Sequence, residues 1–534
     1  MSDGKKFEGV LDRHFESALR ANPVTANHAG LKSGEGKLGR LNAASIERDH
    51  RRNLRTLREL DGINPRGLSA EQHLDRLALR SQLLREIEDH ERGWHRLNPE
   101  APETVMDLLL HELMRGEDEP PRAARNLRAV LKQAPGYLAE ASEVADRPEH
   151  VWRKVMADGC AGVGSLLDAV RSFLAQHQPA KRDESLIAST GTAVELYRDT
   201  VMERAVAPSG SFAIGADRMQ RRVRDELGLN YSLGEIESLA LSEAERIGGL
   251  LEKACARHGR GKSAEELVEQ ARSAWDPGAD LMGLYRTETD RVAKGFKSAN
   301  AVTFPKGDQL VVRLVPPFMR HLFPTAAYSS PGAFEKRQKG TFWVNDLSAV
   351  RKTAADKLAE RQQHFGVSLT AGHEAYPGHH LQFVTANRHP RRWRRLFAHA
   401  VFYEGWTLWC EQMLVDLKID RSPWTKIQQL HDALWRVHRI LVDLRLQTGR
   451  YSYRQAAGHL QKHLGFTKAR SEAEINWYSM APGVPMSYWL GRLENARLHD
   501  RLVKGRGWKL KKFNDWLLSF GTLPQAWLEK YGLA

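Results

Sequence analysis

Residues 369–382 read LTAGHEAYPGHHLQ and interrupt an otherwise helical pattern. A His-Glu pair followed by a second histidine is typical of zincins, in which one helix supplies two metal ligands and the glutamate polarises water. The position one turn after His373 is Pro377, however, and a regular helix would carry His379 to another face. Because proline removes a backbone donor and glycine accepts distorted dihedrals, Pro377-Gly378 predicts a break in the helix.

This break bears on which histidine is the second ligand. A break of two residues would bring His379 to the place of the usual second ligand. On a regular helix His380 would lie about 10 Å along the axis from His373. Zinc–nitrogen bonds of about 2 Å do not allow that separation. We therefore prefer His379, and His380 stays open as the alternative ligand or as a neighbour of the site.

A catalytic zinc centre needs a third protein ligand and one open position. Glu404 lies in the next helical segment, FYEGW at 402–406, and an antiparallel return would bring it toward His373. Glu411, two turns further on, is placed to orient a ligand histidine from outside the ligand shell. Glu374 is then the candidate general base. The alternative is a Pro-Gly helix end with incidental histidines, since the chain has 22 of them.

The rest of the chain indicates two helical regions. Apolar residues recur at helical spacing over most of the 534 residues, and Ser232 with Glu235 is typical of a capping box. The Ala-Pro-Ser-Gly-Ser segment at 207–211 predicts a boundary between an N-terminal helical lobe, 1–210, and a catalytic lobe, 211–534. Within 301–345 the chain becomes β-branched, aromatic and proline-rich, so 311–315 and 340–344 are expected to form strands of a small sheet.

Composition limits the partners and the location that we expect. Lys and Arg number 80 against 66 Asp and Glu, a net charge of +14, yet no nucleic-acid-binding motif accompanies the basic residues. The three cysteines are far apart and predict no disulfide framework. We find neither an apolar leader at the N-terminus nor a run long enough to span a membrane. These patterns predict a cytoplasmic protein with neither nucleic acid nor membrane as partner.

The motif residues resemble a bacterial family known as "domain of unknown function" 885, and the resemblance extends over nearly the whole chain. It is carried by the His-Glu-x-x-Pro-Gly-His motif from His373, by Glu404-Gly405-Trp406-x-Leu408-x-x-Glu411, by Asn22-Pro23, by Leu441-Val442-Asp443, and by Pro482-Gly483 with Ser487-Tyr488 and Gly491. Members are similar in fold to gluzincin-type, Taq-like zinc carboxypeptidases. The resemblance implies a mainly all-α, two-lobed fold with a deep groove, and one divalent metal ion on His373, His379 and Glu404.

The chain also departs from the family pattern on the substrate side. Trp477 stands where the family usually has arginine, Gln447 where it has histidine, and Val484 where it has glutamine. Arginine binds carboxylates through two parallel hydrogen bonds, and histidine can donate to a developing oxyanion, so substrate recognition is expected to differ. We count Trp477, Gln447 and Tyr478 with His380 and Glu411 as substrate contacts or supports of the metal ligands.

These expectations combine into one main hypothesis and two alternatives. The main one is a metal-dependent hydrolase of peptide or other amide bonds, with zinc as first choice of metal and manganese, iron or cobalt still open. Glu374 acts as general base, and Tyr488 stabilises the oxyanion unless it is an ordinary core tyrosine. One alternative is an enzyme that acts on a small amide or ester metabolite. The other is a non-catalytic binding protein that uses the +14 charge on an anionic partner.

Overall fold

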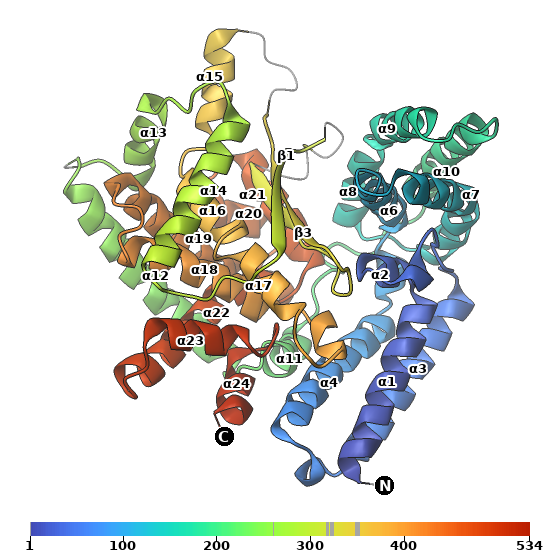
Figure 1. Cartoon of the computed structure of the whole chain (residues 1–534), viewed down its shortest axis with the longest axis horizontal. Helices are drawn as coiled ribbons and strands as arrows, with labels where there is room; N and C mark the ends of the chain where they lie inside the picture. The colour runs from blue at the N-terminus through green and yellow to red at the C-terminus, as the bar shows by residue number, and fades with distance from the viewer. Residues whose placement is uncertain (1, 260, 317–319, 321–324, 348–352, 534) are drawn as a thin grey trace. The chain divides into compact units, whose positions relative to one another are not determined.

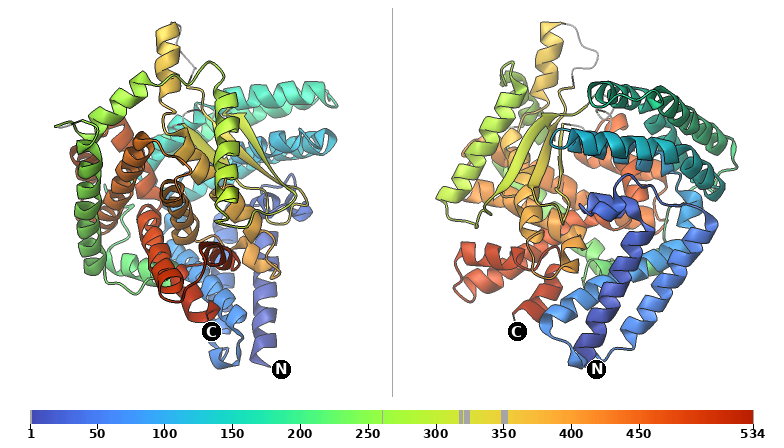
Figure 2. Two further views of the ribbon diagram at one scale, coloured as in Figure 1. Left: turned by 60° about the vertical axis from the view of Figure 1, so that its left-hand side comes forward. Right: turned by 45° about the vertical axis from the view of Figure 1, so that its right-hand side comes forward.

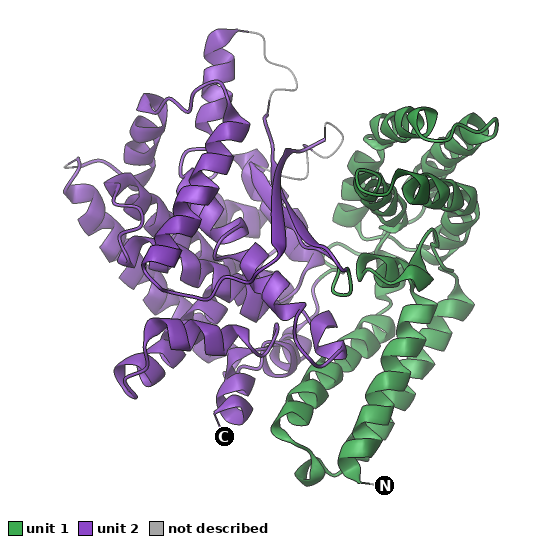
Figure 3. Cartoon of the chain, in the orientation of Figure 1, with its two compact units in different colours: residues 1–212, 332–335 green, residues 213–331, 336–534 purple. Residues whose placement is uncertain are grey.

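The chain forms two compact units. The computed structural model describes residues 2–259, 261–316, 320, 325–347 and 353–533. Unit 1 comprises Met1–Phe212 and Gly332–Glu335, and unit 2 comprises Ala213–Pro331 and Lys336–Ala534 (Figure 3). The division after Phe212 adjoins the 207–211 segment. The short segment Gly332–Glu335 was not expected in unit 1; there Phe334 N donates to Ala29 O over 2.8 Å.

Unit 1 is entirely helical over its described residues. Helix α7 packs against α6 and α10, and α3 packs against α4 (Figure 1). Its helices are α1 (Asp3–Ala21), α2 (Pro23–His28), α3 (Ala43–Asp61), α4 (Ala70–Glu91), α5 (Trp94–Leu97), α6 (Ala101–Arg115), α7 (Pro120–Val144), α8 (His150–Cys160), α9 (Val163–Gln176) and α10 (Asp183–Glu203).

Unit 2 combines helices with one small sheet, so the predicted mainly all-α fold is confirmed. The predicted capping box begins α12: Ser232 N donates to Glu235 Oε2 over 2.7 Å, and Glu235 N donates to Ser232 Oγ over 3.2 Å. The helices are α11 (Ala216–Arg221), α12 (Leu233–Ala256), α13 (Ala264–Ala274), α14 (Leu281–Ser298), α15 (Ala354–Gln362), α16 (Val367–Glu374), α17 (His379–Ala386), α18 (Ala400–Asp416), α19 (Pro423–Gln447), α20 (Tyr453–Leu464), α21 (Lys468–Met480), α22 (Val484–His499), α23 (Leu510–Leu518) and α24 (Gln525–Gly532).

Within the described residues, the sheet has three strands in the order β1-β3-β2. Strands β1 (Asp308–Leu314) and β3 (Gln338–Val344) are parallel, and β2 (Ala326–Ser329) runs antiparallel to β3. Both predicted strands are present and begin two to three residues earlier than expected. The sequence pattern did not indicate β2, which has only four residues.

The sheet is attached to the helices that carry the 369–382 motif. Helix α14 contacts both α16 and β1 and runs beside the sheet in Figures 1 and 2. Tyr285 of α14, Phe342 of β3 and Val367 of α16 belong to one apolar cluster. In a second part of the core, α12 packs against α19 and α18 packs against α22. The three cysteines are free and buried, as expected without a disulfide framework.

Candidate metal centre

The predicted break separates α16 from α17. Helix α16 ends at Glu374 and α17 begins at His379, so Pro377 and Gly378 lie between them. The indole Nε1 of Trp406 donates to Pro377 O over 2.8 Å and ties the break to α18. A Cβ on Gly378 would lie 1.8 Å from the carbonyl oxygen of His373, so only glycine fits there. The second histidine, His379, therefore begins a new helix instead of continuing α16.

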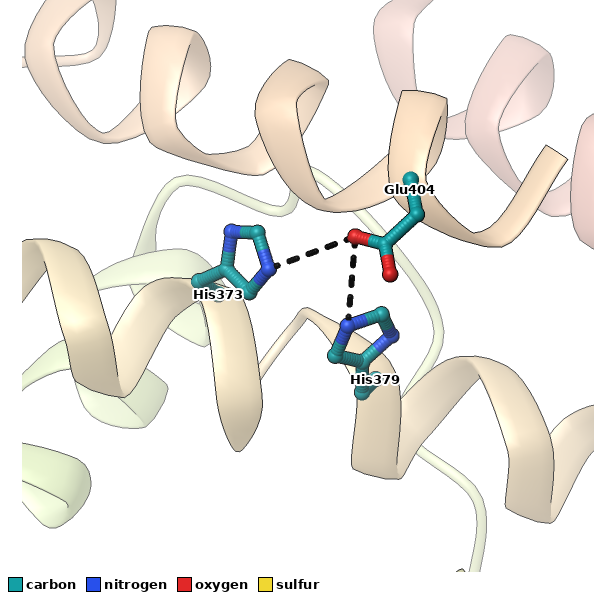
Figure 4. A group of neighbouring side chains, drawn as sticks. All are labelled: His373, His379 and Glu404. Carbon is teal, nitrogen blue, oxygen red and sulfur yellow. Dashed lines mark ion pairs between the residues drawn. The ribbon is translucent and has the colours of Figure 1, made fainter. Parts of the chain in front are cut away.

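Three side chains converge at this break. His373 Nε2 and His379 Nε2 each lie 3.6 Å from Glu404 Oε2 (Figure 4). One ligand-type atom from each residue lies within 4.8 Å of the other two, and all three residues are buried. They come from the end of α16, the start of α17 and the first turns of α18. The three residues that we selected as ligands from the sequence therefore form one cluster.

The distances in this cluster fit the ligands of a single ion better than hydrogen bonds. Two ligands at about 2.1 Å from a tetrahedral zinc ion lie about 3.4 Å apart. A separation of 3.6 Å is close to that value and too long for a hydrogen bond between nitrogen and oxygen. Within the described residues, Glu404 Oε2 and His379 Nδ1 are buried and have no hydrogen-bond partner. Buried polar atoms without a partner are costly, and a cation would satisfy the carboxylate oxygen.

The second nitrogen of His373 is oriented by a carboxylate. His373 Nδ1 and Glu411 Oε1 lie 2.7 Å apart, and both side chains are buried. This contact directs Nε2 toward Glu404, in the carboxylate–histidine arrangement that supports metal ligands. Arg436 Nη2 lies 3.9 Å from the same Glu411 oxygen. Glu411 thus contacts the ring nitrogen of His373 that does not face Glu404.

The neighbouring charges distinguish the two imidazoles. Burial opposes a charge on His373, but Glu404 and Glu411 outweigh it and raise its pKa to about 10. Burial lowers the pKa of His379 to about 4. The pKa of Glu404 lies below its usual range, since the charges of His379 and His373 outweigh burial. The cluster therefore favours one positive charge beside Glu404, which a proton or a metal cation can supply.

Glu374 lies beside this cluster. It is half-buried at the C-terminal end of α16, directly after His373. Burial raises the pKa of Glu374 to about 7; the charge of His373 opposes this rise, and the charges of Glu404 and Glu411 add to it. These surroundings therefore favour the neutral carboxyl group of Glu374 more than water does.

Tyr488 reaches the cluster from α22. Burial, followed by the charge of Glu404, raises the pKa of Tyr488 well above its ordinary value. Helices α18 and α22 approach closely because Gly405 meets Gly491: a Cβ on Gly491 would lie 1.9 Å from Val401 O. The glycine contact thus holds α22, which carries Tyr488, close to α18, which carries Glu404.

His380 is placed outside the cluster. His380 Nε2 lies 3.1 Å from Asp308 Oδ2, and His380 Nδ1 lies 3.0 Å from the hydroxyl of Tyr328. Its side chain is fully buried, and Tyr376 donates to the same Asp308 oxygen over 2.5 Å. Both nitrogens of His380 are thus engaged by β1 and β2, which favours His379 as the second ligand.

The remaining substrate-side candidates surround Tyr488 or support α21. Trp477 meets Tyr488 edge to face, with ring centroids 6.1 Å apart. Gln447 is fully buried and its Nε2 donates to Tyr478 O over 2.8 Å. The Tyr478 hydroxyl donates to Glu474 over 2.7 Å. Trp477 therefore lies near the site, while Gln447 and Tyr478 hold the end of α21.

Several residues near the site were missed because their sequence context is ordinary. Arg439, on the apolar helix α19, lies with its guanidinium carbon 4.6 Å from the ring centroid of Tyr488. Asp443 accepts hydrogen bonds from Gly483 N at 3.1 Å and Met486 N at 3.3 Å and so caps α22. The segments that contain Asp443 and Gly483, both of which carried the family resemblance, thus contact each other. Asp308 and Tyr328 had no signal beyond the β pattern.

The fold and this cluster define a class: a mainly helical protein of two units with a buried His-His-Glu centre in the larger unit. Within that class, the chain belongs to the family described as "Bacterial protein of unknown function (DUF885)", whose model matches residues 23–531. The family resemblance inferred from the motifs is thereby confirmed. A comparison with curated proteins gave no match.

Two solved structures share the fold over essentially the whole chain. A protein from Shewanella oneidensis has 17% sequence identity and a TM-score of 0.77, and covers 99% of this chain and 100% of its own. A protein from Colwellia psychrerythraea has 18% identity and a TM-score of 0.80, and covers 99% of both chains. Both are titled "putative lipoprotein", the first with the addition "of unknown function". At these identities the likeness concerns the fold alone.

These titles correct the predicted location. The prediction of a cytoplasmic protein is wrong by this comparison, because both solved structures of this fold are titled "putative lipoprotein". Composition and long apolar segments, on which the prediction rested, give no information about covalently attached lipid. Within the described part of the chain, no helix is both long and apolar enough to cross a membrane.

Proposed function

We propose that this protein is a divalent-metal-dependent hydrolase of amide bonds, with zinc as first choice of metal. The observation that carries the proposal is the position of Glu404 Oε2, 3.6 Å from His373 Nε2 and from His379 Nε2 and without a hydrogen-bond partner among the described residues. Two imidazoles and one carboxylate form a ligand set of catalytic zinc sites, which keep a fourth position open.

The roles of the protein groups follow from their positions. A divalent ion, when bound, supplies Lewis acidity and makes water a nucleophile near neutral pH. Glu374 takes one proton from the attacking water and passes it to the leaving nitrogen, so that water and an amide become a carboxylic acid and an amine. Tyr488 donates its hydroxyl hydrogen to the carbonyl oxygen as negative charge develops there. Glu411 keeps the His373 ring oriented throughout.

The first test is metal content. Protein purified without chelator is expected to contain about one zinc ion per chain by elemental analysis, as three protein ligands imply. His379→Ala is expected to lose the metal, whereas His463→Ala, which changes an exposed histidine of α20, is expected to keep it. A wild-type protein without stoichiometric metal would overturn the proposal and favour the non-catalytic binding protein.

The second test is hydrolysis of a panel of peptides, small amides and small esters. Glu374→Gln is expected to retain the metal and to lower kcat by about 10²- to 10⁴-fold. Cleavage of peptides supports the peptidase form of the proposal, and cleavage of small amides alone supports the metabolite enzyme. The packing of Trp477 against Tyr488 favours inclusion of uncharged substrates in the panel.

A further inference from the structure

Among the described tyrosine and phenylalanine rings, three lie close to the candidate ligand His379. The ring centroids of Tyr328, Phe383 and Tyr403 lie 6.3, 6.0 and 5.9 Å from that of His379. Phe383 also contacts Tyr328 at 6.4 Å and Tyr403 at 5.7 Å. They come from β2, α17 and α18, three elements that are separate in the chain. We refer to Tyr328, Phe383 and Tyr403 as the aromatic triad.

The triad is only half-buried, unlike the aromatic residues of the adjoining core. All three side chains keep part of their surface accessible. By contrast, Phe402, the neighbour of Tyr403, and Phe342 of β3 are 0% exposed, and Tyr285 is 1% exposed. The triad rings thus keep some accessible surface, and they lie close to buried His379.

The Tyr328 ring is held in place by its polar end. Its hydroxyl contacts His380 Nδ1 at 3.0 Å, and the other nitrogen of His380 contacts Asp308 at 3.1 Å. Since His380 is completely buried, the hydroxyl is engaged in the interior and the ring remains as the contact surface. The Tyr328 and His379 rings are nearly parallel, at 15°, and those of Tyr328 and Phe383 at 18°. A rigid aromatic surface loses little entropy when it binds.

We propose that the aromatic triad binds an apolar, aromatic group of the substrate next to the amide bond that is cleaved. This inference rests on the proposed function and names its substrate class. Aromatic groups pack on such rings in offset or edge-to-face arrangements and bury apolar surface as well. A carboxylate in the same place would lose its hydration against three rings that carry no formal charge. His380 acts as a positioning residue for Tyr328.

The inference can be tested by binding, without turnover. Zinc-loaded protein is titrated in a calorimeter with the α-hydroxamates of phenylalanine, alanine and aspartic acid, which share one metal-binding group and differ in side chain. The phenylalanine compound is expected to bind at least about tenfold more tightly than the alanine compound, as apolar pockets discriminate. The aspartic acid compound is expected to bind no better than the alanine compound.

Variants assign this preference to the triad. Phe383→Ala is expected to weaken binding of the phenylalanine compound by about tenfold and to change binding of the alanine compound by less than about twofold. Only the contact with the phenylalanine side chain is removed. Tyr328→Ala is expected to act similarly, and Tyr328→Phe, which keeps the ring, to retain most of the preference. The matched control is Phe520→Ala, which removes a half-buried phenylalanine that packs on Trp516.

The remaining outcomes distinguish failure of this inference from failure of the proposed function. Equal binding of the three hydroxamates, or a preference for aspartic acid, overturns the inference and leaves the metal centre intact. A Phe383→Ala variant that binds all three compounds equally weakly shows a structural role and overturns the inference too. Binding of none of the compounds to the wild-type protein overturns the proposed function, and the inference with it.

Discussion

At the scale of single residues, Glu404 determines which charge the site can bind. Its Oε2 faces both imidazoles and lacks a hydrogen-bond partner among the described residues, and the charge of the same carboxyl group adds to burial in raising the pKa of Tyr488. A buried carboxylate in this position needs a positive charge nearby. His373 can supply it as a protonated imidazole, and a divalent cation between the three side chains would supply it more fully.

The role of Tyr488 can be separated from that of Glu404. If Tyr488 donates to the substrate, Tyr488→Phe should lower kcat by about 10²-fold and leave the metal content unchanged, because one oxyanion donor is lost. Steady-state kinetics on a cleaved amide, beside elemental analysis, measures both. Loss of metal in this variant would contradict the assignment and would show that the hydroxyl supports the ligand Glu404 instead.

Histidines outside the site should control stability in acid. His438 Nδ1 and His459 Nε2 lie 3.0 Å apart, so at least one nitrogen must accept. Burial, followed by the charges of other groups, lowers the pKa of His438 to about 4 and that of His459 to about 3. The unfolded chain, with an ordinary histidine pKa of about 6.5, therefore binds more protons below that pH. The contribution of this pair to stability should be constant above pH 6.5 and should be lost as the pH falls from about 6.5 to 4.

Protonation of His438 is expected to lower the free energy of unfolding by about 3 kcal/mol once the pH is below the pKa of His438 in the folded protein. Urea denaturation at a series of pH values measures it. The control is His438→Gln. Its free energy of unfolding should fall less in acid than that of the wild-type protein, because glutamine does not titrate. A variant with the same slope as the wild-type protein would exclude this pair as its source.

At the scale of elements, two close approaches position the site. The break between α16 and α17 depends on Gly378, and the crossing of α18 and α22 depends on Gly405 and Gly491. In each place a Cβ would lie within 3 Å of backbone atoms of the neighbouring segment. The backbone therefore has to move before any other residue fits, and ligand geometry tolerates little movement.

Gly491→Ala is expected to destabilise unit 2 by about 1–3 kcal/mol, as overpacking does, and to reduce activity by moving Tyr488 away from Glu404. Gly458→Ala is the matched control, because the exposed Gly458 in α20 has open space around its Cβ position. That control should be neutral or gain up to about 1 kcal/mol from helix propensity. Equal stability of the two variants in thermal unfolding would show that the crossing tolerates a methyl group.

At the scale of the whole molecule, all three candidate ligands belong to unit 2. A ligand stabilises the unit that binds it, by about 4 kcal/mol at a thousandfold excess over Kd. Removal of the metal by a chelator should therefore speed amide hydrogen exchange in α16, α17 and α18 and leave α7 of unit 1 unchanged. Mass spectrometry resolves the two sets of peptides. Equal acceleration in α7 would mean that the two units open together.

The sequence alone was sufficient for the features that depend on local chemistry. Helical periodicity, the Ser232 capping box and the two longer strands follow from side-chain pattern, and the Pro377-Gly378 break follows from the backbone limits of those two residues. The family was recognisable because its motif is local as well. The four-residue strand β2 was missed, since so short a run has no distinct periodicity.

Tertiary structure decided which of these residues meet. The sequence predicted a helical protein with a broken His-Glu motif and three candidate metal ligands. It left His379 and His380 as alternatives for the second ligand. The fold separates them: His379 faces Glu404, and His380 is held by Asp308 and Tyr328 from the sheet. Arg439 beside Tyr488 and the three rings around His379 are likewise contacts between distant segments. A spacing pattern records the geometry of one helix or strand, whereas a site depends on how several of them pack.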